Sequence, residues 1–194
     1  MFLAKLEDCL LKSLVIRSVA ALLCCASAWG DGQSAGVEVS KALLTAIEKV
    51  SPKATILQAN EVDAKSCAPT PRIRTLVRAD LNGDGLEDAA VLLKTFISNE
   101  ITMWQGRELR RADFLFVIFL NDGKGGYLAR QLDKFPGYIP VNAFIYLRSG
   151  KIRPMRTKKD VTLSNPAIVL AHCERSAAAY VVTGTRVREI PLSD

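Results

Sequence analysis

The chain has 194 residues, of which 49% are hydrophobic and 24% are charged, and it carries a formal net charge of +6 at pH 7. This composition is that of a globular protein rather than a disordered one, and the length suits one domain with a sizeable core. The basic excess is mild and is not interleaved with aromatic residues, so we expect no nucleic-acid partner.

The first 28 residues have the pattern of a secretory signal peptide. Three basic residues, Lys5, Lys12 and Arg17, precede an apolar run over residues 19–25, and residues 26–28 form a small-residue cleavage site. We therefore expect cleavage after Ala28 and a periplasmic or secreted product.

The mature product, residues 29–194, is expected to form a single globular domain. Spanning a bilayer takes about 20 apolar residues, and no stretch of the chain approaches that length, so we expect no stable membrane span. Lipid attachment at Cys24 or Cys25 is an alternative, although neither cysteine follows the small residue that this modification requires.

One amphipathic helix is predicted near the start of the mature chain. Apolar residues recur at helical spacing as Val39, Ala42, Leu43, Ala46, Ile47 and Val50. Pro52 ends the segment. Because this stripe lacks an aromatic anchor, we expect the helix to pack on a sheet rather than to lie on a membrane surface.

Residues 80–88 place oxygen-bearing side chains at positions 1, 3, 5 and 9 of a tight turn: Asp80, Asn82, Asp84 and Asp88. Position 7, Leu86, can add its backbone carbonyl. Ca²⁺ takes six to eight oxygens at about 2.3–2.6 Å, so water would complete the shell. We therefore predict that these five residues bind Ca²⁺.

The flanks of this loop exclude an EF-hand, which needs a bidentate Glu at position 12 and a helix on each side. Position 12 is Val91, and the segments 73–78 and 89–93 are rich in aliphatic and β-branched residues, as strands are. The loop is thus expected to join two strands. The alternative is a metal-free hairpin, because Asn, Asp and Gly also dominate ordinary turns.

Residues 79–93 and 119–127 together resemble the FG-GAP or VCBS-type repeat of secreted bacterial proteins and of the calcium-bearing blades of β-propellers. In that family an Asp-x-Asn-Gly-Asp-Gly-x-x-Asp loop is followed by an aliphatic strand and then by a Leu-Asn-Asp-Gly-x-Gly-x-Tyr turn. The resemblance covers about residues 73–132 and implies calcium at the loop. A propeller needs about four to eight blades, and the chain carries one such unit, so no propeller is expected.

The remainder of the chain is predicted to form short strands near residues 55–59, 73–78, 88–96, 114–120, 127–132, 142–147, 151–155, 167–172, 177–183 and 186–190. Residues 114–120 are apolar on both faces, which predicts a central strand with a layer on each side. Residues 98–111 are expected to form a loop, in which Trp104 either anchors a partner or, as is commoner, folds back on the core.

These elements predict an α+β fold. The N-terminal helix is expected to pack on a mostly antiparallel β-meander sheet with one calcium-binding hairpin loop. Removal of residues 1–28 leaves Cys67 and Cys173 as the remaining cysteines in an oxidising compartment, which favours a disulfide between them. Two unconnected thiols are the alternative.

Catalytic motifs are missing from the sequence. The one histidine, His172, precedes Cys173 in a predicted strand, where adjacent side chains point to opposite faces, so the two cannot form a local dyad. No nucleophile elbow, zinc motif, P-loop or dinucleotide fingerprint is present. We expect a protein that is not an enzyme.

The sequence favours an exported calcium-binding protein that acts as a non-catalytic binding or inhibitor-like module of the cell envelope. The alternatives are a structural accessory domain whose calcium is purely stabilising, and an envelope hydrolase with a nonstandard site. Basic segments at residues 107–111 and 148–159 could attract an envelope protein or an anionic glycan, although such runs are often solvated faces. The oligomeric state is left open.

The disulfide can be tested on mature protein. We expect no free thiol under denaturing alkylation, and Cys67→Ser should destabilise the protein by about 4 kcal/mol, because the bridge closes a loop of roughly 100 residues. Two alkylated cysteines per chain would refute the pairing.

Overall fold

The computed structural model describes residues 39–63, 73–104, 106–173 and 176–192. Strands dominate the described residues, at 61% of them against 9% for helix. The helical elements are α2 (Lys41–Val50) and the 3₁₀ helix η1 (Ala59–Glu61). The strands are β1 (Thr55–Ile56), β2 (Leu76–Ala79), β3 (Asp88–Trp104), β4 (Arg107–Asn121), β5 (Tyr127–Ile139), β6 (Ala143–Arg148), β7 (Lys151–Ile152), β8 (Val161–Thr162), β9 (Ala167–His172), β10 (Ser176–Thr183) and β11 (Arg186–Leu192).

The predicted α+β class is therefore wrong, and the protein is mostly β. The sequence pattern correctly places a helix before the strands, but that helix is ten residues long. The strands moreover do not form one meander. They divide into a five-stranded antiparallel sheet, a four-stranded antiparallel sheet and a two-stranded ribbon. The pattern of apolar residues identifies single strands and does not say which sheet each one joins.

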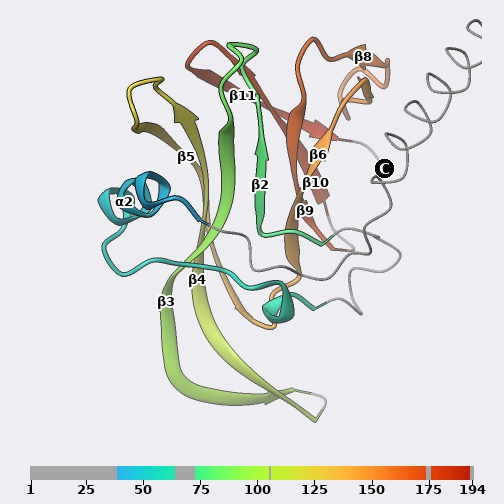
Figure 1. Ribbon diagram of the computed structural model, residues 1–194. Helices are drawn as coiled ribbons and strands as arrows, with labels where there is room; N and C mark the ends of the chain where they lie inside the picture. The colour runs from blue at the N-terminus through green and yellow to red at the C-terminus, as the bar shows by residue number, and fades with distance from the viewer. Residues whose placement is uncertain (1–38, 64–72, 105, 174–175, 193–194) are drawn as a thin grey trace, which may run out of the picture. The chain divides into compact units, whose positions relative to one another are not determined.

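The five-stranded sheet has the order β1-β3-β4-β5, with β2 also paired to β3 (Figure 1). Strand β4 lies between β3 and β5, and apolar clusters cover both of its faces. The prediction that residues 114–120 form a central strand is confirmed.

The four-stranded sheet has the order β11-β10-β9-β6 and packs against one face of the first sheet. Phe114 and Phe116 of β4 share a buried cluster with Ile145 of β6 and Ile168 of β9. The rings of Phe116 and Tyr180, the latter from β10, meet edge to face at 5.0 Å. Contacts of this kind join the two sheets into a sandwich.

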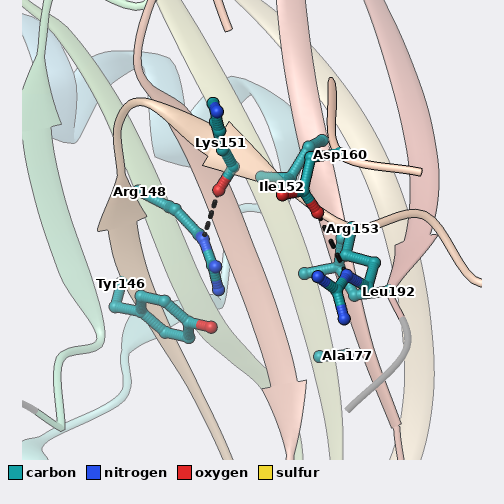
Figure 2. Close-up of a pocket in the computed structure, with 8 residues that line it drawn as sticks. All are labelled: Tyr146, Arg148, Lys151, Ile152, Arg153, Asp160, Ala177 and Leu192. Carbon is teal, nitrogen blue, oxygen red and sulfur yellow. Dashed lines mark hydrogen bonds and ion pairs between the residues drawn. The ribbon is translucent and has the colours of Figure 1, made fainter. Parts of the chain in front are cut away.

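The β7–β8 ribbon lies beside the second sheet. Its neighbouring surface contains a hollow of about 420 Å³ whose walls come from β6, the ribbon, β10 and β11 (Figure 2).

Helix α2 covers the other face of the first sheet (Figure 1). Leu43 and Ile47 are buried against Val91 of β3 and Val117 of β4. The helix begins at an N-cap in which Leu43 N donates to Ser40 Oγ at 3.2 Å. Among the described residues, no helix has both the length and the apolar content needed to cross a membrane.

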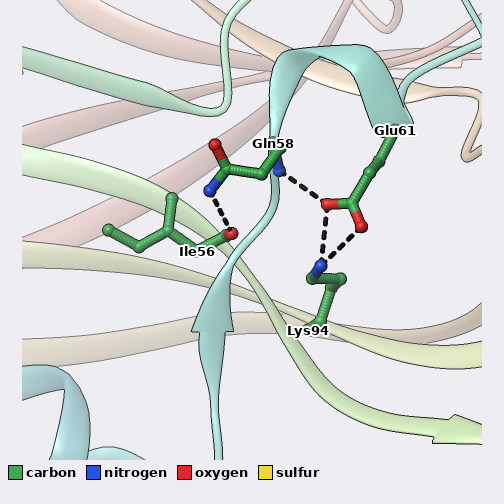
Figure 3. A network of polar contacts seen from close by, with 4 residues as sticks. All are labelled: Ile56, Gln58, Glu61 and Lys94. Atoms are coloured by element: carbon green, nitrogen blue, oxygen red, sulfur yellow. Dashed lines mark hydrogen bonds and ion pairs between the residues drawn. The ribbon is translucent and has the colours of Figure 1, made fainter. Parts of the chain in front are cut away.

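An ion pair joins η1 to β3 (Figure 3). Lys94 Nζ lies 2.6 and 2.7 Å from the two carboxylate oxygens of Glu61, and both side chains are mostly buried. The same carboxylate accepts a hydrogen bond from Gln58 N at 2.8 Å, and Gln58 Nε2 donates to Ile56 O. Because the ammonium contacts both carboxylate oxygens and the carboxylate also accepts from Gln58 N, the pair can stay buried without an unpaired charge.

The loop predicted for residues 98–111 is wrong, because β3 and β4 continue as a paired hairpin that extends beyond the other strands (Figure 1). We call residues 96–111 the β3–β4 arm. The register runs from Ile101 opposite Arg110 to Trp104 opposite Arg107. Trp104 is 50% exposed, so it does not fold back on the core. The arm buries neither face, which explains why it lacks the alternating apolar pattern of the other strands.

The sandwich can be tested with a double-mutant cycle on Phe116→Leu and Tyr180→Leu. We expect a coupling energy of about 0.5–1.5 kcal/mol from denaturant unfolding, because the two rings touch across the sheets. The control pair is Phe116→Leu with Tyr127→Leu, since Tyr127 packs on the opposite face of the sheet. That pair should be additive, and equal coupling in both cycles would contradict the arrangement.

Candidate calcium-binding loop

The predicted calcium loop connects the end of β2 to the start of β3. Its turn is held by the carboxylate of Asp80, which accepts hydrogen bonds from Gly83 N at 2.7 Å and from Gly85 N at 2.9 Å. Both glycines have φ near +80°, a conformation that residues with a Cβ rarely adopt. The glycine spacing is thus required by the turn itself.

The middle of the loop repeats this side-chain-to-backbone bonding. Asp84 N donates to Asn82 Oδ1 at 3.0 Å, and Leu86 N donates to Asp84 Oδ1 at 2.9 Å. Asn82 Nδ2 also donates to Asp84 Oδ2 at 2.9 Å. Asp84 is an exposed residue, and both of its carboxylate oxygens accept a hydrogen bond within the loop.

Asp88 differs from the other loop residues because it is fully buried. Its two oxygens accept hydrogen bonds from Leu81 N at 3.0 Å and from Asn121 N at 2.9 Å. Burial raises the pKa of Asp88 above its ordinary 3.8, the two backbone donors oppose that rise, and the charges of Asp84 and Asp80 add to it. The three carboxylates therefore interact electrostatically.

Asn121, at the end of β4, is a residue whose role the sequence did not reveal. Its amide N–H binds Asp88, and its side-chain Nδ2 donates to Glu87 O at 3.3 Å. The following turn is closed by Asp122, whose Oδ1 accepts from Lys124 N and Gly126 N. These donors lower the pKa of Asp122. The sequence feature that could have pointed to Asn121 is its position in residues 119–127, the turn that resembles the second part of the FG-GAP or VCBS-type repeat.

The donor chemistry of the loop fits Ca²⁺, which prefers carboxylate, amide and carbonyl oxygens. A divalent cation would also offset the repulsion that Asp80 and Asp84 exert on Asp88. The carboxylates do not already converge on one point, since no cluster of three acidic, His or Cys side chains arranged for a metal occurs within the described ranges. Binding would therefore require side-chain rotation, with Asp84 leaving its bond to Asn82.

The predicted disulfide involves one residue inside the described ranges and one outside. Cys173 is 7% exposed at the end of β9, and its backbone N donates to Asn142 O at 2.8 Å. Cys67 lies outside the described residues, as does the signal segment 1–28 with its cleavage site after Ala28. The pairing and the cleavage remain predictions.

His172, the residue named for the hydrolase alternative, lies at the end of β9 beside Phe135 of β5. The two rings meet edge to face with centroids 4.9 Å apart. This contact uses the imidazole as a packing surface between the two sheets.

In comparisons with known proteins, no family model, curated protein or solved structure matches this sequence.

The raised pKa of Asp88 leads to a pH prediction for the metal-free protein. Between pH 3.8 and the higher folded-state pKa, the folded chain keeps a proton that the unfolded chain releases. The contribution of Asp88 to the free energy of unfolding should therefore fall as pH rises through this window. A carbon-13 carboxyl NMR titration should show Asp88 titrating above its ordinary value and Asp122, the internal control, below its own. A pKa below the ordinary value for Asp88 and above it for Asp122 would contradict the buried position of Asp88 and the backbone donors around Asp122.

Proposed function

We propose that this protein is an exported, calcium-binding β-sandwich that acts as a non-catalytic binding module of the cell envelope. The observation that carries the calcium assignment is the charge arrangement at the β2–β3 turn. Four carboxylates lie within residues 80–88, and the charges of Asp84 and Asp80 add to the rise in the pKa of Asp88 that its burial causes. A bound cation would relieve this repulsion without any change in the strands.

The calcium in this proposal has a stabilising role. Asp88 begins β3 and is bonded to Asn121 at the end of β4, so the loop is attached to the two central strands of the first sheet. An ion held by the loop would strengthen this attachment. The ion would thus stabilise the folded state by binding it in preference to the unfolded chain.

A binding role is favoured over a purely structural one by the β3–β4 arm. The arm exposes several large apolar side chains: Phe96, Ile97, Ile101, Met103 and Trp104. Burying them would stabilise the folded chain, yet the arm projects them into solvent. Clustered exposure of this kind is typical of surfaces that contact a partner.

The hydrolase alternative has less support. His172 packs on Phe135, and the hollow in Figure 2 is lined by other residues. General acid–base chemistry needs a titrating group within hydrogen-bond reach of the substrate. His172 does not line that hollow, so the hollow lacks the imidazole on which the hydrolase alternative depends.

Calorimetry of metal-stripped protein tests the calcium proposal. We expect heat on addition of Ca²⁺ and a higher melting temperature, equivalent to about 2.7 kcal/mol when the free ion is at 100 times Kd. Asp84→Ala should abolish both signals, because it removes an exposed ligand without opening the core. Glu108→Gln, which removes an exposed charge from the arm, should leave both signals unchanged. Absence of heat and of a thermal shift in the unaltered protein would sink the proposal.

A further inference from the structure

The hollow beside the β7–β8 ribbon is built from segments that are far apart in the sequence. Its lining residues are Tyr146 and Arg148 of β6, Lys151 and Ile152 of β7, Arg153, Asp160, Ala177 of β10 and Leu192 of β11. Its volume of about 420 Å³ falls within the usual range of about 300–1,000 Å³ for small-ligand sites.

The charge of the hollow is positive. Arg148, Lys151 and Arg153 contribute three cationic groups, and Asp160 is the one acidic residue among the lining side chains. Asp160 Oδ1 accepts from Arg153 Nε at 3.0 Å, which accounts for one of the three cations. The remaining excess would attract a ligand that carries negative charge.

Arg148 is positioned to provide the main contact. Its Nε donates to Lys151 O at 3.2 Å, which holds the guanidinium in place (Figure 2). Within the described part of the chain, no hydrogen bond or ion pair occupies its two Nη groups. A guanidinium held in this way presents a planar pair of donors that matches a sulfate, phosphate or carboxylate group.

The other walls of the hollow suit the body of a sugar. The phenol of Tyr146 lines the same space as the Arg148 guanidinium (Figure 2), and its ring is stacked on Phe144 at 5.9 Å. Ile152 and Leu192 are buried apolar residues that form part of the lining. An aromatic ring with a hydroxyl next to aliphatic carbon can contact the C–H face of a sugar while the hydroxyl serves its polar groups.

We infer that this hollow binds an anionic saccharide through a charged substituent held by Arg148. The inference rests on the proposed binding role, but it does not depend on calcium, because the hollow and the β2–β3 loop share no residue. A concave site of this size favours one or two sugar rings over a broad acidic protein face or a bilayer, which would meet the rim of the hollow rather than its interior.

The inference can be tested by calorimetry on full-length protein with four probes. These are a sulfated disaccharide, its desulfated counterpart, sodium sulfate, and vesicles containing an anionic phospholipid. We expect saturable binding of the sulfated disaccharide and at least tenfold weaker binding of the desulfated sugar and of sulfate alone. The result should be the same in Ca²⁺ and in chelator. A negative result for Ca²⁺ binding would therefore leave the saccharide inference standing, and a negative result for the disaccharide would leave the calcium proposal standing.

The decisive variants are Arg148→Ala and a matched control, Arg130→Ala, which removes an arginine of β5 in the other sheet whose Nε likewise donates to a backbone carbonyl, that of Thr185, at 2.9 Å. Arg148→Ala should weaken disaccharide binding at least tenfold with an unchanged melting temperature, Arg148→Lys should restore part of it, and Arg130→Ala should have no effect on disaccharide binding. Equal loss in both alanine variants would indicate attraction by net charge and overturn the site. Sulfate binding as tight as the disaccharide, or binding of vesicles without the sugar, would overturn the saccharide assignment.

Discussion

The fold depends on the burial of β4 on both of its faces. Along residues 114–120 the even-numbered side chains enter the cluster shared with the second sheet, and the odd-numbered ones enter the cluster under α2. Burying one large apolar side chain contributes about 1.5–3 kcal/mol, so exposing either face of this strand would cost about as much as the whole free energy of unfolding of a typical domain. The second sheet and the helix therefore both have to cover β4.

The candidate calcium loop is attached to this same strand. Asp88 accepts a hydrogen bond from Asn121, which is the last residue of β4, and Leu86 lies so close to Gly123 that a Cβ there would be 3.3 Å from Leu86 Cδ1. The loop also lies beside the connection between β8 and β9, since a Cβ on Gly83 would lie 2.9 Å from Asn165 Nδ2. A cation in the loop would thus stabilise a point where the central strand meets the connection that leads into the second sheet.

The surfaces available to partners are formed by residues other than those of the loop. The β3–β4 arm presents exposed apolar side chains on an extension of the first sheet, whereas the hollow at Arg148 belongs to the second sheet and the β7–β8 ribbon. The fully buried side chains are concentrated in the sandwich and under α2. This separation is suited to a module in which a metal would stabilise the scaffold while other surfaces make contacts, because changes at the contact surfaces then cost little stability.

The sequence by itself determined the local features of this protein. The helical spacing of residues 39–50, the two-faced apolar run of β4 and the geometry of the turn at residues 80–88 each depend on neighbours within one element, so their patterns could be read directly. Only the tertiary structure decided the division into two sheets, the link between Asp88 and Asn121, and the hollow formed by Tyr146, Arg148 and Leu192. These features join residues that are distant along the chain, and alternation within a strand carries no information about its partner.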